Sequence, residues 1–412
     1  MWNPNRPDMR RLLIHILMLV SLTAGAAGTD STAFVHRVGL DMRAAYLNQS
    51  HDFFKGKNAL GRPMKTILSG HMQYSFMFPA DSPLGRMYPT AYQGIGVASY
   101  SFLNHQEVGT PTAVYVFQGA RIASFGPELS LDYEWNFGAS FGWNPYAPAD
   151  KDGNGGNPAN LVIGTKVNAY VNASLMLSWS PVPEWTLSAG LDYTHFSNGD
   201  TYFPNAGIDG LGGRVGVVRS FNGIPPSRRG NMRWNDFKGM KFADRVSVDV
   251  IAYGAWNAEN VQYGDKGYML DGKFGVFGLH VNPLYMISSF LRVGPSLDIQ
   301  YNEGVNLGAH VVGTDPDENE IRFFRPPLSE QLAAGLSLRA EIQMPIFSVN
   351  LGIGHNILYK CEELGGIYNF VALKAFVTKS LFAHVGFKAS YTESSNNLML
   401  GIGWRFGNNA DD

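Results

Sequence analysis

An alternation of apolar and polar residues runs through most of the chain after Ser31, and it limits the possible folds more than any other feature. In residues 128–138 apolar side chains occupy the odd positions from Leu129 to Phe137, and Glu, Ser, Asp, Glu and Asn occupy the even ones. Successive side chains of a strand point to opposite faces, so the pattern predicts strands with one apolar and one polar face. Acidic residues at successive inward positions suit a wet barrel lumen better than a dry core.

The connections between these segments also favour a barrel. Long polar loops at 144–160 and 304–328 alternate with tight turns such as 180–183. Membrane barrels have long loops at one end and short turns at the other. We therefore expect an all-β protein, an antiparallel transmembrane β-barrel of about 14 strands, within a range of about 12 to 16. Residues 398–406 resemble the closing strand of an outer-membrane barrel, and residues 222–240 are expected to form a basic connection on the short-turn side.

The N-terminus has the features of a secretory signal peptide, to which we assign residues 1–28. Basic residues precede an apolar run at 12–22, and small residues follow at 24–26. No later segment offers the roughly 20 continuous apolar residues of a transmembrane helix. Residues 29–412 are therefore expected to form one barrel with extracellular loops, located as a multi-pass protein in the cell outer membrane.

Charge and cysteine content exclude several classes of function. The chain has 32 basic and 34 acidic residues, a balance that gives no reason to expect a nucleic-acid partner. Cys361 is the single cysteine, so no disulfide can form within the chain. No Cys or His spacing typical of a metal site occurs, and we expect neither a metal nor another cofactor.

One segment combines residues that could carry chemistry. His195 and Ser197 are two residues apart in a predicted strand, so they project from the same face and an imidazole could accept the hydroxyl proton. That face also carries apolar residues such as Leu191, which places the pair on the lipid-facing wall. Asp209 has the outward register of the next strand and lies next to His195, where a carboxylate would orient the imidazole.

The loop after Ser197 could complete such a site. Asn198 and the backbone at Gly199 are candidate donors to an oxyanion. Most His-x-Ser pairs are incidental, so the pair alone is weak evidence. The lipid-side placement, the Asn-Gly that follows and the outward Asp209 make a serine esterase the better interpretation.

The same residues resemble a known family. His195-Phe196-Ser197-Asn198-Gly199, followed by Pro204-Asn205-Ala206-Gly207-Ile208-Asp209, looks like the signature of the lipid A 3-O-deacylase (acyloxyacyl hydrolase) family. The spacing from the His to the acidic residue also fits (209 − 195 = 14). The resemblance implies hydrolysis of an ester-linked acyl chain of lipid A, the lipid part of lipopolysaccharide, in the outer leaflet. The best-known members carry Glu where this chain has Asp209, and they form a smaller barrel of eight strands.

Two other functions remain open. Outer-membrane phospholipase A, which works with calcium as a dimer, has a similar His-x-Ser-Asn-Gly motif in a larger barrel. The expected strand number favours the phospholipase, whereas Pro204-Asn205 and Gly207-Ile208 favour the deacylase. The non-enzymatic alternative is a porin-like barrel in which the three residues have lost their function.

Overall fold

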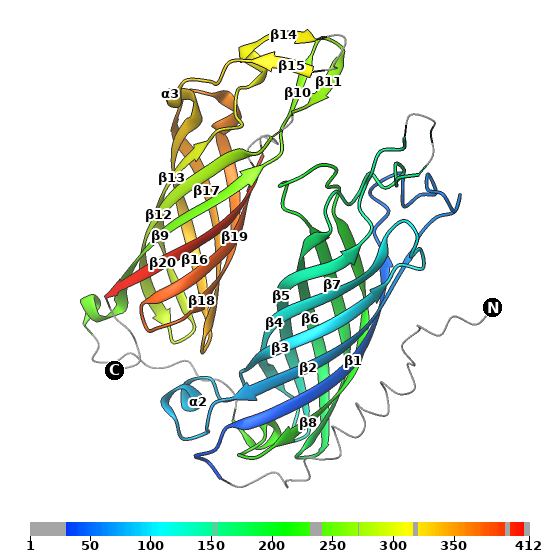
Figure 1. The fold of residues 1–412 in the computed structure, drawn as a ribbon. Helices are drawn as coiled ribbons and strands as arrows, with labels where there is room; N and C mark the ends of the chain where they lie inside the picture. Colours follow the sequence, from blue (N-terminus) through cyan, green and yellow to red (C-terminus); the bar gives the residue numbers. More distant parts are fainter. Residues whose placement is uncertain are drawn as a thin grey trace, which may run out of the picture.

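The computed structural model describes residues 30–407 except 151–152, 154, 231–240, 271, 316–319 and 392–395. The expected signal peptide therefore lies outside the described residues. The chain is almost entirely antiparallel β-structure, and its long strands close into two barrels that lie side by side (Figure 1). No helix in the described ranges is both long and apolar enough to span a membrane.

The first barrel consists of the first eight strands in chain order, and it is closed by pairing between β1 and β8. Its strands are β1 (Val35–Leu47), β2 (Thr66–Met77), β3 (Tyr92–Ser101), β4 (Gly109–Ser124), β5 (Leu129–Trp143), β6 (Val167–Val182), β7 (Trp185–Ser197) and β8 (Ile208–Phe221). A short helix, α2 (Pro83–Met87), lies between β2 and β3.

The second barrel also has eight strands and is closed by pairing between β9 and β20. Its strands are β9 (Val246–Asn257), β12 (Phe274–Ser288), β13 (Leu291–Asn302), β16 (Leu332–Gln343), β17 (Phe347–Tyr359), β18 (Gly366–Phe376), β19 (Leu381–Ser390) and β20 (Asn397–Gly407). Its long loops contain the hairpins β10 (Asn260–Tyr263) with β11 (Lys266–Met269) and β14 (Val311–Asp315) with β15 (Glu320–Phe323), and the helix α3 (Leu328–Gln331). Single 3-10 turns are η1 (Pro226–Arg228), η2 (Phe242–Arg245), η3 (Gly308–His310) and η4 (Glu362–Leu364).

The antiparallel barrel class is confirmed, but the expectation of one barrel is not. The strands divide into two closed sets of eight, and residues 222–245, which include the connection expected at 222–240, link β8 of the first set to β9 of the second. Residues 231–240 of that connection lie outside the described residues. The final strand, β20, does close a barrel, but its partner is β9 and not the first strand of the chain. An alternating pattern gives the faces of each strand but not the partner with which the last strand closes, because closure is a long-range contact.

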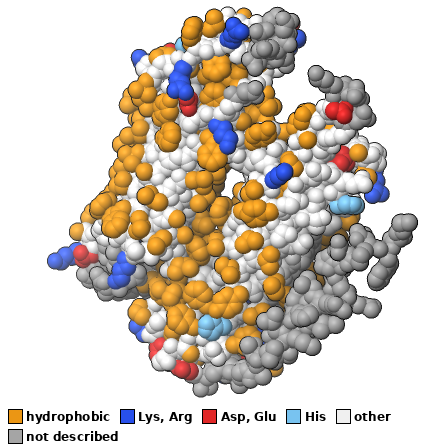
Figure 2. Space-filling model, viewed as in Figure 1, with side chains coloured by type: hydrophobic (Ala, Val, Ile, Leu, Met, Phe, Trp, Pro, Cys, Tyr) orange, Lys and Arg blue, Asp and Glu red, His pale blue; other side chains and the backbone are white. Residues whose placement is uncertain are grey.

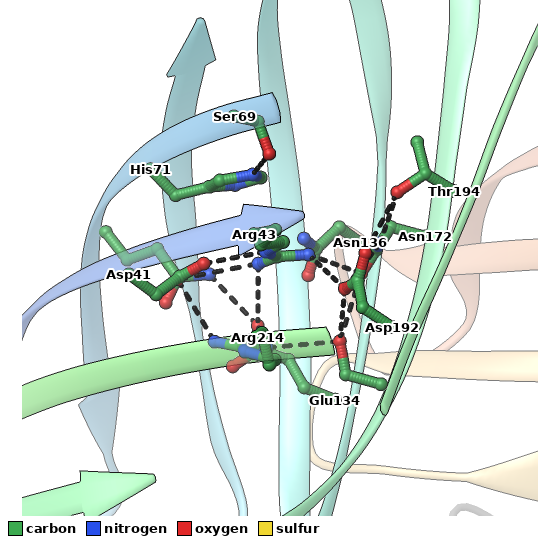
Figure 3. Close-up of polar contacts among 12 residues, drawn as sticks. Asp41, Arg43, Ser69, His71, Glu134, Asn136, Asn172, Asp192, Thr194 and Arg214 are labelled. Carbon is green, nitrogen blue, oxygen red and sulfur yellow. Dashed lines mark hydrogen bonds and ion pairs between the residues drawn. The ribbon is translucent and has the colours of Figure 1, made fainter. Parts of the chain in front are cut away.

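The two faces of the strands differ as the alternation predicts. Along β6 buried and exposed side chains alternate over most of its length, and hydrophobic side chains are spread over the outer walls of both barrels (Figure 2). The lumen of the first barrel holds a buried network in which Arg43 and Arg214 point toward Asp41, Glu134 and Asp192 (Figure 3). Because a buried ion is costly unless it is paired, these mutual contacts are what allow five charged groups inside the barrel.

The barrels contact each other at the end with short turns. The Tyr88 hydroxyl donates to the backbone carbonyl of Ser289 at 2.8 Å, and the rings of Trp135 and Phe347 meet edge to face at 5.4 Å. Beside these contacts the walls enclose an apolar crevice of about 410 Å³. The outer surfaces of β4 and β5 therefore face the second barrel at this end.

Candidate active site

The register of β7 and β8 brings two of the predicted site residues together at the long-loop end of the first barrel. His195 lies directly opposite Asp209. Further along the same face Leu191 and Leu211 are 63% and 62% exposed, which shows that this face is the outer wall of the barrel. The outward placement expected from the alternation is thus observed, and it follows from the strand period of two.

A carboxylate holds the imidazole on this wall. His195 Nδ1 lies 2.8 Å from Asp209 Oδ1, and each side chain is 32% exposed. The Tyr193 hydroxyl donates to the same oxygen at 2.6 Å. If Nδ1 carries the proton of the neutral ring, Nε2 is the acceptor and is available as a base.

Ser197 lies two residues beyond His195 on the same face of β7. Within the described part of the chain, neither its hydroxyl nor Nε2 of His195 has a hydrogen-bond partner. The two groups are therefore not committed to other contacts. Catalytic hydrogen bonds often tighten only when substrate binds, so this arrangement is compatible with proton transfer between them.

The loop that follows is held by its own side chains. Asn198 is buried, its backbone N–H donates to Asn205 Oδ1 at 3.0 Å, and its Nδ2 donates to the carbonyl of Tyr202 at 2.7 Å. Asn205 Nδ2 in turn donates to Asp200 Oδ1 at 3.0 Å. Asn198 was predicted as an oxyanion donor. Its backbone N–H and its Nδ2 instead donate to residues of the loop and hold the loop in shape.

Gly199 is the other candidate donor, and its backbone is in an unusual conformation. Its φ of +66° lies in the left-handed region, which glycine adopts without the penalty that a side chain imposes. Its N–H has no acceptor among the residues that the structure describes. Of the two predicted oxyanion donors, Gly199 is therefore the one whose backbone amide is unoccupied.

Comparison with known families assigns the chain. The family model described as "Lipid A 3-O-deacylase (PagL)" matches residues 49–218, and the model described as "Acyloxyacyl hydrolase, C-terminal domain" matches residues 246–409. The chain belongs to the lipid A 3-O-deacylase family. Together the two models cover most of the sequence, so membership applies to both barrels, and the family is one of hydrolases.

The two family matches follow the division of the fold. The lipid A 3-O-deacylase match contains β2 to β7, β8 as far as residue 218 and all the predicted site residues, and the C-terminal match begins at the first residue of β9. The strands within the C-terminal match therefore form a complete second barrel. The site belongs to the first barrel.

Solved structures that resemble the chain are outer-membrane barrels of low sequence identity. Neisserial surface protein A is 9% identical, and the match covers 46% of this chain and 99% of that protein, with a TM-score of 0.29. The siderophore receptor PirA from Pseudomonas aeruginosa is also 9% identical, and the match covers 90% and 80%, with a TM-score of 0.25. No curated protein matches the chain.

Two features of the site were not predicted from the sequence. Tyr193 was not among the predicted site residues, yet its hydroxyl donates to Asp209 Oδ1. Asn205 was noted only as part of the motif, yet it holds the loop that carries Gly199. Tyr193 and Asp209 are diagonal neighbours across the β7–β8 pair, and a long side chain can span that distance, so the register could have indicated this contact.

Proposed function

We propose that this protein hydrolyses an ester-linked acyl chain of lipid A in the outer leaflet by a serine esterase mechanism. The observation that carries the proposal is the contact between His195 Nδ1 and Asp209 on the lipid-facing wall, with Ser197 on the same face. A polar group of this kind has little reason to face lipid unless its substrate is itself a lipid beside the barrel.

In the proposed reaction Ser197 Oγ attacks the ester carbonyl carbon while Nε2 of His195 takes the hydroxyl proton. Asp209 keeps the proton on Nδ1 and stabilises the imidazolium that forms. The Gly199 N–H donates a hydrogen bond to the negatively charged carbonyl oxygen, and Asn198 shapes the loop that carries this N–H. Collapse of the tetrahedral intermediate breaks the ester bond, and His195 returns the proton to the leaving glycolipid hydroxyl.

The second half of the reaction restores the enzyme. A water molecule attacks the acyl-serine carbonyl while His195 accepts one of its protons. The bond to Ser197 Oγ then breaks, the serine regains a proton from His195, and the fatty acid leaves. Each role is assigned to a residue that the sequence signature already contains.

Mass spectrometry of lipid A tests the proposal in Gram-negative cells that express the protein or its Ser197→Ala variant. We expect loss of one ester-linked acyl chain only with the intact serine. The Ala variant retains the backbone and differs by one hydroxyl, so both forms should reach the membrane in equal amounts. Unchanged lipid A with new lysophospholipid would replace this proposal with a phospholipase, and no change in either lipid would leave the porin-like alternative.

A further inference from the structure

The second barrel reaches the predicted active site at the long-loop end. The loop after β7 lies next to two elements of that barrel, the start of β20 and the segment that follows β9. Both contacts fall on residues 199 and 200, directly after Ser197 and Asn198. The barrels therefore meet at the site as well as at the short-turn end, where Tyr88 contacts Ser289.

The first contact is a packing contact. A Cβ atom at Gly199 would lie 3.4 Å from Cβ and 3.6 Å from Cδ1 of Leu398, which is ordinary van der Waals distance. Leu398 belongs to the outward face of β20 and is only partly exposed, whereas Ile402, on the same face, is 65% exposed. The Leu398 side chain thus borders Gly199 on the side where a side chain of residue 199 would lie.

The second contact is a hydrogen bond. The backbone N–H of Ala258, one residue after β9, donates to the carbonyl of Asp200 at 3.0 Å. Asp200 has a φ of +63°, a left-handed conformation that is uncommon outside glycine and has to be held by its surroundings. On its other side the carboxylate of Asp200 accepts from Asn205. The loop is therefore fixed from both barrels.

We infer that the second barrel is a positioning element of the hydrolase site, which holds the Asn198–Asp200 loop through the Leu398 side chain and the Ala258 amide. The inference rests on the proposed function, since it assigns Gly199 the oxyanion. An oxyanion donor works only if it is placed before the reaction, and a shift of about 1 Å can cost about a hundredfold in rate. The second barrel supplies this placement without contributing a catalytic residue.

Substitution at Leu398 tests the packing contact in the full-length protein. Leu398→Ala should lower kcat about tenfold and change KM less than about twofold, because the loop loses its support while the lipid-facing wall of the first barrel is unchanged. Leu398→Met, which restores the volume, should recover most of the activity. Leu336→Ala is the matched control, because Leu336 is 52% exposed on β16, four strands away around the same barrel.

Ala258 offers a second pair of variants. Ala258→Pro removes the N–H that donates to Asp200, whereas Ala258→Ser keeps it. We expect the proline variant to lose kcat as Leu398→Ala does, and the serine variant to behave as the unmodified protein. Folding of each variant is checked by the electrophoretic mobility of the unheated barrel in detergent.

The outcomes separate this inference from the proposed function. If the unmodified protein is active, Ser197→Ala is inactive, and Leu398→Ala and Ala258→Pro are folded with unchanged kcat, the second barrel has no part in positioning and the inference is wrong. A decrease of kcat in Leu336→Ala as large as that in Leu398→Ala would also overturn the inference, because the effect would then be general destabilisation. If Ser197→Ala retains the full activity, it is the proposed function that fails.

Discussion

Asp209 is the residue on which the contacts of the site converge. One of its carboxylate oxygens, Oδ1, accepts from Tyr193 at 2.6 Å and lies 2.8 Å from His195 Nδ1. The Tyr193 hydroxyl and the His195 imidazole together hold the carboxylate more firmly than the imidazole alone. Hydrogen bonds to a charged carboxylate are stronger than those between neutral groups, so the tyrosine contact adds to the restraint. The Asp209 carboxylate is thus held by contacts with two side chains of β7.

Removal of the Tyr193 hydroxyl should therefore lower activity without harming the fold. Tyr193→Phe keeps the ring on the barrel wall and deletes only the donor to Asp209. We expect kcat for lipid A deacylation to fall about tenfold. Tyr74→Phe is the control, since Tyr74 is equally exposed on β2 and its hydroxyl contacts His36 away from the site. Equal activity of the two variants would contradict a positioning role for Tyr193.

A second residue-scale effect concerns Glu259, next to the Ala258 amide. Burial, Glu363 and Asp200 together raise the pKa of Glu259 from 4.5 to about 8. Between these two values the unfolded chain ionises this carboxyl while the folded protein keeps it protonated, so the folded state loses stability as pH rises. The loss is complete above the folded pKa and is absent below the unfolded pKa.

The loss of stability with rising pH predicts that the contact between Ala258 and Asp200 weakens at high pH. Hydrogen exchange should show a lower protection factor for the Ala258 amide at about pH 9 than at about pH 6, once the intrinsic rate is corrected for. In Glu259→Gln the protection factor should be the same at both values, because no charge develops beside Asp200. A pH-dependent decrease of equal size in the Gln variant would show that another group is responsible.

At the scale of the element, the hairpin of β7 and β8 explains why the placement of the candidate site residues could be predicted. The period of two is a local property of the sequence, so it placed His195 and Ser197 on the outer face before any partner strand was known. Asp209 followed because a hairpin pairs neighbouring segments of the chain. The loop was less predictable, since the contacts of Asn198 with Tyr202 and Asn205 depend on the three-dimensional path of residues 199–207.

Closure of the first barrel depends on the pairing of β1 with β8, which the alternation of residues does not predict. β1 and β8 pair with Ala45 opposite Gly212, and a Cβ at Gly212 would lie 2.1 Å from the backbone oxygen of Ala44. Such a contact cannot be relieved by moving a side chain, because its partner is backbone. The alternation identified β8 as a strand with its lumen and lipid faces, but not β1 as its second neighbour.

A pair of neighbouring glycines tests this role. Gly212→Ala should strongly reduce the fraction of protein that folds into the membrane, because β1 and β8 cannot approach closely enough to pair. Gly213→Ala should fold normally, since its added Cβ would find only the Gly190 carbonyl oxygen, at 3.5 Å. Refolding yields of the two variants in lipid vesicles provide the measurement. Equal yields would mean that the strands can separate locally and still close the barrel.

At the scale of the whole molecule, the two barrels are separate hydrogen-bonded units. Every strand pair formed by the described residues lies within one barrel or within a loop hairpin. Each barrel also has its own buried ionic network, and in the second barrel Lys374 and Arg405 share Asp249 and Glu341. Among the described residues the barrels share no strand pairing and meet through side-chain and loop contacts, so we expect the barrels to unfold in distinct steps.

A change in the ionic network of the second barrel should destabilise that barrel without affecting the unfolding of the first. Lys374→Met leaves Arg405 to balance two carboxylates that are fully buried, Asp249 and Glu341. Breaking a buried pair costs about 3–5 kcal/mol, so peptides of the second barrel should exchange hydrogen at lower urea concentration while those of the first keep their midpoint. Lys388→Met is the matched control, because Lys388 is equally buried but donates to the neutral Gln300. A common shift in both barrels would show that they unfold as one unit, and the second barrel would then support the site through overall stability as well as through local contacts.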